Sequence, residues 1–227
     1  MRSSKAVALA AAVMMAAHAT AAEKKEDVDK RLKEASDVIK EIAGADDKGV
    51  PKDLFQKAKC AVVIPGMKKG GFIVAAQYGR GFATCKGPAG VYNNLSAMRM
   101  EGGSVGFQAG GSSTDILLLV MNEKGAERLW GSKFTLGGEA SVAAGPVGRD
   151  ATAQTDATMK AEILSYSRSQ GVFGGVALKG STLRADDDVN QIIYGKKVQP
   201  KAILGDHSVL PPASTQPFLV ELNKFAK

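Results

Sequence analysis

The stretch from residue 60 to residue 86, CAVVIPGMKKGGFIVAAQYGRGFATCK, limits the possible folds more than any other part of the sequence. Its apolar, β-branched runs are typical of strands, and Pro65-Gly66, the MKKGG segment and Gly79-Arg80-Gly81 separate them. Glycine adopts the positive-φ conformations that tight turns require. The pattern therefore predicts a β-meander of three strands, CAVVIP, GFIVAAQY and FATCK, within an antiparallel sheet.

The first 21 residues have the form of a secretory signal peptide. MRSSK is basic, AVALAAAVMMAA is apolar and rich in alanine, and Ala17-His18-Ala19 or Ala19-Thr20-Ala21 has the small residues of a cleavage site. The apolar run is shorter than the roughly 20 residues that a membrane span needs. We expect a bacterial protein whose residues 1–21 are removed on export. Residues 22–227 are then a single domain in the periplasm, peripheral to an envelope membrane, or secreted.

The two cysteines of the chain, Cys60 and Cys85, lie in the first and third strands of the predicted meander. Two cysteines in an exported protein favour a disulfide. In a flat meander, however, the outer strands are about 10 Å apart, which is too far for a disulfide unless the sheet curls. At this point the sequence leaves both alternatives open, a disulfide between Cys60 and Cys85 or two free thiols.

Basic residues are concentrated in the same part of the chain. Residues 48–86 contain eight Lys or Arg and one acidic residue, Asp53, while the formal net charge of the whole chain is +7. A basic surface of this kind attracts anionic phospholipid. It can equally be a solvated face that keeps the protein soluble. The candidate lipid-binding residues are Lys52, Lys57, Lys59, Lys68, Lys69 and Arg80.

The rest of the chain predicts further strands and peripheral helices. Residues 22–43 place Val28, Leu32 and Ile39 on one stripe of an amphipathic helix, and its balanced charge favours packing on the protein's own core over a membrane surface. Residues 95–111 predict a hairpin with its tip at Gly102-Gly103, and residues 115–121 a strand buried on both faces. Residues 205–227 predict a loop and a final helix. The fold class is α+β, mainly antiparallel β in a curled sheet, sandwich or barrel-like form, with peripheral helices.

The polar residues offer little for catalysis. His18 leaves with the predicted signal peptide, so His207 is the one histidine of the mature chain. Closely spaced His and Cys ligands of a zinc site are absent from the sequence, as are the glycine-rich motifs that bind nucleotides. Neighbours such as Asp206, His207 and Ser208 rarely form a catalytic triad. We therefore expect no catalytic residues, no metal, no cofactor and a surface position for His207.

A set of strings spread over residues 39–204 occurs in the order and spacing of one known family. These strings are AKCAVVIPG, GGFIVAAQYGRGFATC, EGGSVGFQAGGSSTDILLLVMN, GPVGRD, SYSRSQGVFGGVALKGSTLR and NQIIYG. The chain resembles the SYLF domain, a family of lipid-binding domains whose fungal members also bind actin. The resemblance implies a β-rich domain with flanking helices and no enzymatic activity. It also implies phospholipid binding through basic residues and an N-terminal amphipathic segment.

We expect an exported, non-enzymatic domain that binds anionic phospholipid at an envelope membrane surface through the basic residues named above. The alternative is a structural or interaction protein of the envelope that engages another protein through its β surface. The basic residues have few aromatic neighbours, which argues against nucleic acid as a partner. Export from the cytoplasm argues against actin as a partner.

Overall fold

The computed structural model describes residues 23–44, 49–71, 74–105, 110–131, 133–148, 160–169, 172–176 and 178–226. The predicted signal peptide, residues 1–21, lies outside them. The centre of the fold is a nine-stranded sheet in which β5-β9-β3-β2-β1-β4-β7-β6 are neighbours in that order and β8 pairs with β7. Every pairing is antiparallel except that of β6 with β7.

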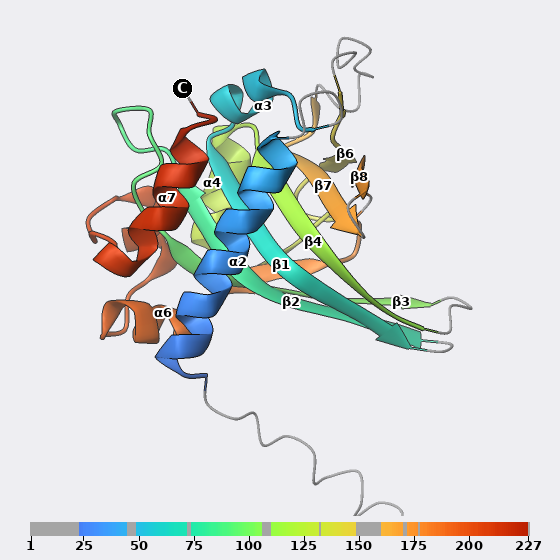
Figure 1. Ribbon diagram of the computed structural model, residues 1–227, viewed down its shortest axis with the longest axis horizontal. Helices are drawn as coiled ribbons and strands as arrows, with labels where there is room; N and C mark the ends of the chain where they lie inside the picture. Colours follow the sequence, from blue (N-terminus) through green and yellow to red (C-terminus); the bar gives the residue numbers. More distant parts are fainter. Residues whose placement is uncertain are drawn as a thin grey trace, which may run out of the picture.

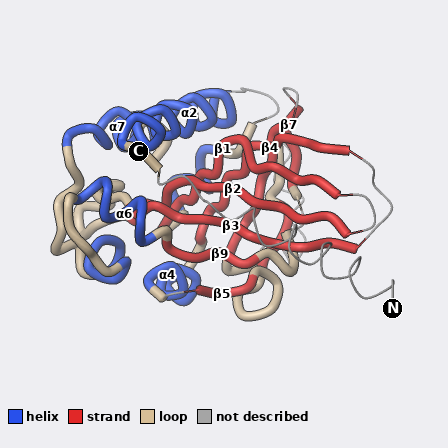
Figure 2. The backbone as a smooth tube through the Cα atoms, turned by 90° about the horizontal axis from the view of Figure 1, so that it is seen from below, coloured by secondary structure: helices blue, strands red, loops and turns tan. Residues whose placement is uncertain are grey.

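The strands differ greatly in length. Four long strands form the middle of the sheet and short strands complete its two sides: β1 Cys60–Gly71, β2 Val74–Cys85, β3 Ser96–Val105, β4 Gly110–Val120, β5 Lys133–Thr135, β6 Val142–Ala144, β7 Ile163–Ser169, β8 Val172–Gly175 and β9 Thr182–Ala185. Figure 2 shows how strongly this sheet curls from β7 round to β5. The predicted fold class, α+β with a curled and mainly antiparallel sheet, is confirmed.

Helices cover both faces of the sheet. On one face α2 (Lys25–Gly44) lies beside α7 (Gln216–Asn223) and across β1 and β2 (Figure 1). On the other face α4 (Glu123–Trp130) contacts the single π-helical turn η1 (Lys201–Gly205). The other helices of the described residues are α3 (Lys52–Lys57), α6 (Asp187–Tyr194) and the 3₁₀ turn η2 (Ala213–Thr215).

Alternate residues of the central strands enter two separate cores. Val63 of β1 packs with α2 and α7, whereas its neighbour Val62 packs on the opposite face with α4 and η1. The same alternation places Leu117 and Leu118 of β4 in different cores. Because successive strand residues point to opposite faces, a strand covered on both sides needs a continuous apolar run. This explains the sequence DILLLV at the end of β4.

The predicted three-strand meander is wrong, because the structure has two long strands there. β1 continues through Pro65-Gly66, where its register with β2 and β4 shifts at a bulge and Gly66 has a φ of 56°. β2 continues through Gly79 and Gly81 without a turn. A Cβ on Gly81 would lie 1.9 Å from the backbone oxygen of Val63, so this glycine permits a close approach of β1. The glycines of this stretch therefore permit a bulge and close strand packing, and they do not reverse the chain.

The hairpin tip predicted at Gly102-Gly103 is also wrong, because β3 passes through both glycines and ends at Val105. The long strands β1 to β4 consequently run past the helices (Figure 1). We call their outer parts the projecting end of the sheet, defined as residues 68–71, 74–78, 101–105 and 110–115. At the other side of the sheet β7 and β8 form an antiparallel pair.

Candidate functional site

The predicted lipid-binding residues lie in three separate places. Lys52, Lys57 and Lys59 lie on or next to α3, beside the first residue of β1. Lys68 and Lys69 lie on β1 at the projecting end. Lys68 is nine positions after Lys59 along a chain that is extended from Cys60 onward, which corresponds to about 30 Å. The structure therefore divides the basic cluster seen in the sequence into two surfaces, and it places Arg80 elsewhere.

Arg80 belongs to a partly buried cluster of charges under the start of α2. Its Nε lies 3.0 Å from Oδ2 of Asp186, and its guanidinium also pairs with Glu23, which in turn pairs with Arg31. The Asp186 side chain is only 1% exposed. Burial raises the pKa of Asp186 above its ordinary value, although the positive charges of Arg80 and Arg99 oppose that shift. Arg80 thus neutralises buried carboxylates and is not part of an open basic surface.

Lys68 and Lys69 occupy the middle of the four-stranded projecting end. Lys68 is opposite Tyr78 on β2 and Ser113 on β4, while Lys69 is opposite Gln77 and Ser112. Neighbouring strand residues point to opposite faces, so the two lysines place one ammonium group on each side of the sheet. Lys68 is exposed and Lys69 is half-buried. Within the described residues neither lysine has an ion-pair partner.

The other basic surface surrounds the disulfide end of the β1–β2 hairpin. Cys60 and Cys85 are directly opposite each other on neighbouring strands and are joined, with a Cα–Cα distance of 4.0 Å. The sequence left this bridge open because a three-strand meander would have separated the cysteines. The correct two-strand pairing brings them together. Their disulfide forms part of the wall of a cavity of about 520 Å³, which we call the recess.

The recess gathers residues from four distant segments of the chain. Its polar lining includes Lys57 at the end of α3, Lys59 just after that helix, Lys86 after β2, Glu123 at the start of α4, and His207 after η1. Lys59 Nζ lies 2.8 Å from Glu123 Oε1. Burial lowers the pKa of Lys86, and the positive charge of Lys59 lowers it further. Like charges therefore face each other in the recess.

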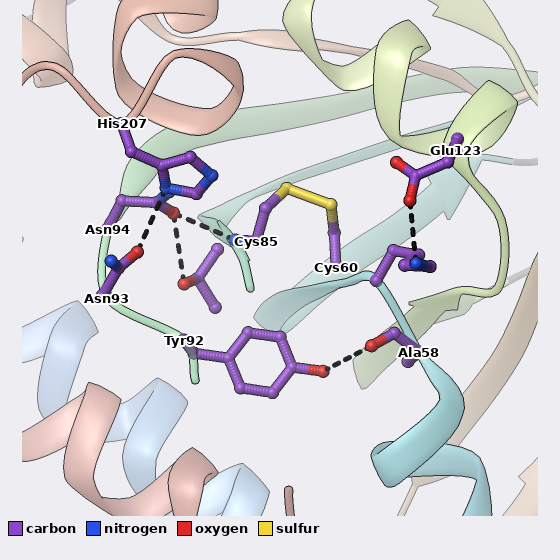
Figure 3. Close-up of a disulfide and its surroundings, with 10 residues drawn as sticks. Ala58, Cys60, Cys85, Tyr92, Asn93, Asn94, Glu123 and His207 are labelled. Carbon is purple, nitrogen blue, oxygen red and sulfur yellow. Dashed lines mark hydrogen bonds and ion pairs between the residues drawn. A yellow bond between two sulfur atoms is a disulfide. The ribbon is translucent and has the colours of Figure 1, made fainter. Parts of the chain in front are cut away.

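Hydrogen bonds fix the walls of the recess (Figure 3). The Oδ1 atom of Asn94 accepts from the backbone N–H of Cys85 at 2.9 Å, while its Nδ2 lies 2.6 Å from Nδ1 of His207. Lys86 Nζ donates to the backbone oxygens of Phe55 and Gln56 at 3.1 and 2.7 Å. His207 is half-buried between these loops. His207 therefore lies in a surface loop, as expected, and its ring also contacts Asn93 and Asn94.

Sequence reasoning missed Lys86, Trp130 and His207 as neighbours of Lys57 and Lys59. Lys86 is one of the eight basic residues of the 48–86 segment, but nothing in the sequence indicates that it lies in a cavity. Trp130 is the single tryptophan of the chain and comes from α4, 70 residues after Cys60. A lone tryptophan beside a strand-rich segment is the one signal that could have drawn attention to it. Only the folded chain brings these residues together.

The helices and the metal-binding residue types limit what else the described residues can do. None of the helices within these residues has both the length and the apolarity to cross a bilayer. The apolar stripe of α2, including Val28, Leu32 and Ile39, is packed against the sheet. No group of three His, Cys, Asp or Glu side chains in the described ranges is placed to hold a metal ion.

These features define a class of protein: an α+β domain with a curled antiparallel sheet and two separate basic surfaces. A family model described as "Ysc84: Las17-binding protein actin regulator" matches residues 101–225, and the chain belongs to this family. The resemblance to the SYLF domain is thereby confirmed.

The chain is similar to several eukaryotic proteins. It is 34% identical over 178 residues to an SH3 domain-containing protein of Schizosaccharomyces pombe, covering 77% of this chain and 41% of the relative. The SH3 domain-containing YSC84-like protein 1 of Rattus norvegicus is 30% identical over 202 residues, covering 86% and 58%. Protein YSC84 of Saccharomyces cerevisiae is 31% identical over 179 residues, covering 77% and 37%. The chain thus spans between about a third and three fifths of these relatives.

The comparisons correct one expectation about partners. We expected export from the cytoplasm to exclude actin as a partner. That expectation is wrong, because the matching family is described as a Las17-binding actin regulator. A further relative from Saccharomyces cerevisiae is named LAS seventeen-binding protein 3 and is 33% identical over 178 residues. The description of the family and the name of this relative therefore refer to Las17 binding, and the family description also refers to actin regulation.

Proposed function

We propose that this domain binds membrane surfaces rich in anionic phospholipid, through Lys68 and Lys69 at the projecting end of the sheet. The observation that supports this most is the local charge balance. Glu101 and Asp115, the acidic residues of the projecting end, are paired with Arg184 and Arg168 at 2.8 and 2.6 Å. The lysines are left without carboxylate partners within the described residues, so the region has a net attraction for anions.

The binding we propose is electrostatic and reversible. A basic residue close to an anionic leaflet contributes about 1 kcal/mol to the free energy of membrane binding. Lys68 and Lys69 together therefore give weak attachment. Insertion of the N-terminal helix would require its apolar stripe to leave the core, where Leu32 is 4% exposed and Ile39 fully buried. The proposal therefore needs no insertion of α2. It also needs no catalytic step, and we propose that the domain acts by binding after export.

The experiment is co-sedimentation of residues 22–227 with vesicles of phosphatidylglycerol and phosphatidylcholine, against vesicles of phosphatidylcholine alone. We expect binding to the anionic vesicles, release as salt shortens the Debye length to about 3 Å near 1 M, and loss of binding in Lys68→Glu/Lys69→Glu. The matched control is Lys30→Glu/Lys33→Glu, which changes the net charge equally on exposed side chains of α2. Equal binding by the wild type and the Lys68/Lys69 variant would refute the proposal.

A second candidate function is binding to actin or to a Las17-like protein, which the description of the family favours. Exposed strands and lysines of the projecting end could contact a protein as well as a membrane. Co-sedimentation with filamentous actin tests this directly. Binding to actin that survives in Lys68→Glu/Lys69→Glu would place the protein-binding surface elsewhere.

A further inference from the structure

The lining of the recess has an excess of positive charge, with three lysines and one glutamate. Lys57 and Lys59 have half-exposed or more exposed side chains, and each is paired with a carboxylate, Asp53 at 3.0 Å and Glu123 at 2.8 Å. Lys86 lies deeper and has no carboxylate partner among the described residues. Its ammonium group contacts two backbone oxygens and lies 5.3 Å from the ring centre of Tyr92. An ammonium group has three donor hydrogens, so these two bonds leave one available.

The electrostatics of Lys86 indicate that this charge is not compensated. Burial is the main cause of its lowered pKa, and the repulsion from Lys59 is the second. Nothing acidic within the described residues offsets these two effects at Lys86. An anion placed between the two ammonium groups would remove the repulsion and favour the charged form of Lys86.

The indole of Trp130 lines the same cavity. The Nε1–H group of Trp130 is buried and has no acceptor among the described residues, although buried polar groups are normally hydrogen-bonded. The ring of Trp130 is held close to the backbone, because a Cβ on Gly205 would lie 2.9 Å from it. The Cys60–Cys85 disulfide forms another wall. Close packing thus holds one wall of the recess in place, and a covalent bond holds the other.

We propose that the recess binds the phosphate group of a small ligand, with Lys59 and Lys86 as its cationic contacts and Trp130 as part of its wall. Lysine is a frequent phosphate ligand because it offers a compact charge and several donors. The volume of about 520 Å³ is within the range of small-molecule sites and exceeds what one phosphate fills. The recess lies about 30 Å along β1 from Lys68, so this site is separate from the proposed membrane-binding surface.

The single tryptophan makes the test direct. We propose to titrate the full mature protein with inorganic phosphate at constant ionic strength and to follow the fluorescence of Trp130. We expect a saturable change that chloride at equal ionic strength does not produce. In Lys59→Met the apparent Kd should rise about tenfold, as expected for loss of one charge-assisted hydrogen bond.

A paired variant predicts the opposite effect. Glu123→Gln removes the carboxylate that competes for Lys59, so phosphate should bind several-fold more tightly. Lys33→Met, which removes an exposed charge on α2, is the matched control and should leave the affinity unchanged. No saturable change, or equal effects of Lys59→Met and Lys33→Met, would overturn the proposal.

Two further arms identify the source of the phosphate. If it belongs to a lipid, vesicles with phosphatidic acid should bind more tightly than vesicles with phosphatidylglycerol, and Lys59→Met should remove that difference. If only inorganic phosphate binds, the ligand is a soluble phosphate compound. Lys68→Glu/Lys69→Glu should bind phosphate normally in both cases, so failure of vesicle binding and failure of the recess are separate results.

Discussion

The covered part of the sheet and its projecting end are built from the same four strands but are stabilised differently. In the covered part, β1 is buried on both faces, and Val62 and Val63 are fully buried in different cores. In the projecting end, Lys68, Gly70 and Ala76 are exposed. The two glycines Gly81 and Gly70 illustrate the contrast, because a Cβ at Gly81 would meet backbone and one at Gly70 would meet nothing within 4 Å.

Charged side chains have different surroundings in the covered part of the sheet and at its projecting end. Charges in the covered part, such as Arg80, are used to compensate other buried charges. At the projecting end and around the recess, Lys68, Lys69 and Lys86 have no carboxylate partner within the described residues, and these are the charges for which we propose binding roles. We therefore expect substitutions in the covered part to change the free energy of unfolding and those at the projecting end to change only binding.

The largest effect should come from Arg80→Ala. It would leave Asp186 and Glu23, which are 1% and 7% exposed, with less positive charge to compensate them. Removal of one partner of a buried ion pair typically costs about 3 to 5 kcal/mol. Urea unfolding followed by circular dichroism measures it. A variant as stable as the wild type would show that Arg80 is not a structural residue.

Loss of the disulfide should have the next largest effect. The bridge closes a loop with a sequence separation of 25 residues, so Cys60→Ser/Cys85→Ser should lower the free energy of unfolding by about 3 kcal/mol in the chain-entropy model. Because both cysteines line the recess, phosphate binding should weaken as well. Mass spectrometry of the non-reduced protein provides the control, since two alkylatable thiols in the wild type would contradict the prediction.

The two glycines give a matched pair with opposite signs. Gly81→Ala should destabilise the protein by about 2 to 3 kcal/mol, because β1 backbone must move to accept the methyl group. Gly70→Ala should be neutral or stabilise by about 0.5 kcal/mol, because alanine has less backbone freedom to lose in a strand. Thermal unfolding of both variants checks this. Equal losses would mean that the projecting end is packed as tightly as the covered part.

His207→Ala should lower the free energy of unfolding by about 1 kcal/mol, less than Gly81→Ala does. It removes the hydrogen bonds of His207 Nδ1 with Asn93 and Asn94, which lie at 3.1 and 2.6 Å. The expected readout is a small decrease in unfolding midpoint with normal binding to anionic vesicles. Loss of vesicle binding in a folded variant would contradict this prediction, because it would show that His207 takes part in membrane binding.

The sequence by itself determined the fold class, the family and the residue types available for binding. Continuous apolar runs such as that ending β4 identify strands covered on both faces, because burial on two sides removes the need for alternation. The amphipathic stripe of α2 likewise identifies a helix that packs on the core. These patterns depend only on residues that are close together in the sequence, so they can be recognised without knowledge of long-range contacts.

Only the tertiary structure decided whether Gly66, Gly79 and Gly81 mark turns or a bulge with close packing, because glycine permits both conformations and the neighbouring strand selects between them. That choice also decided that Cys60 and Cys85 are neighbours and could be joined. It further separated Lys59 from Lys68, and long-range folding paired Arg80 with Asp186. A side chain's charge is written in the sequence, but its partners depend on contacts between segments far apart along the chain.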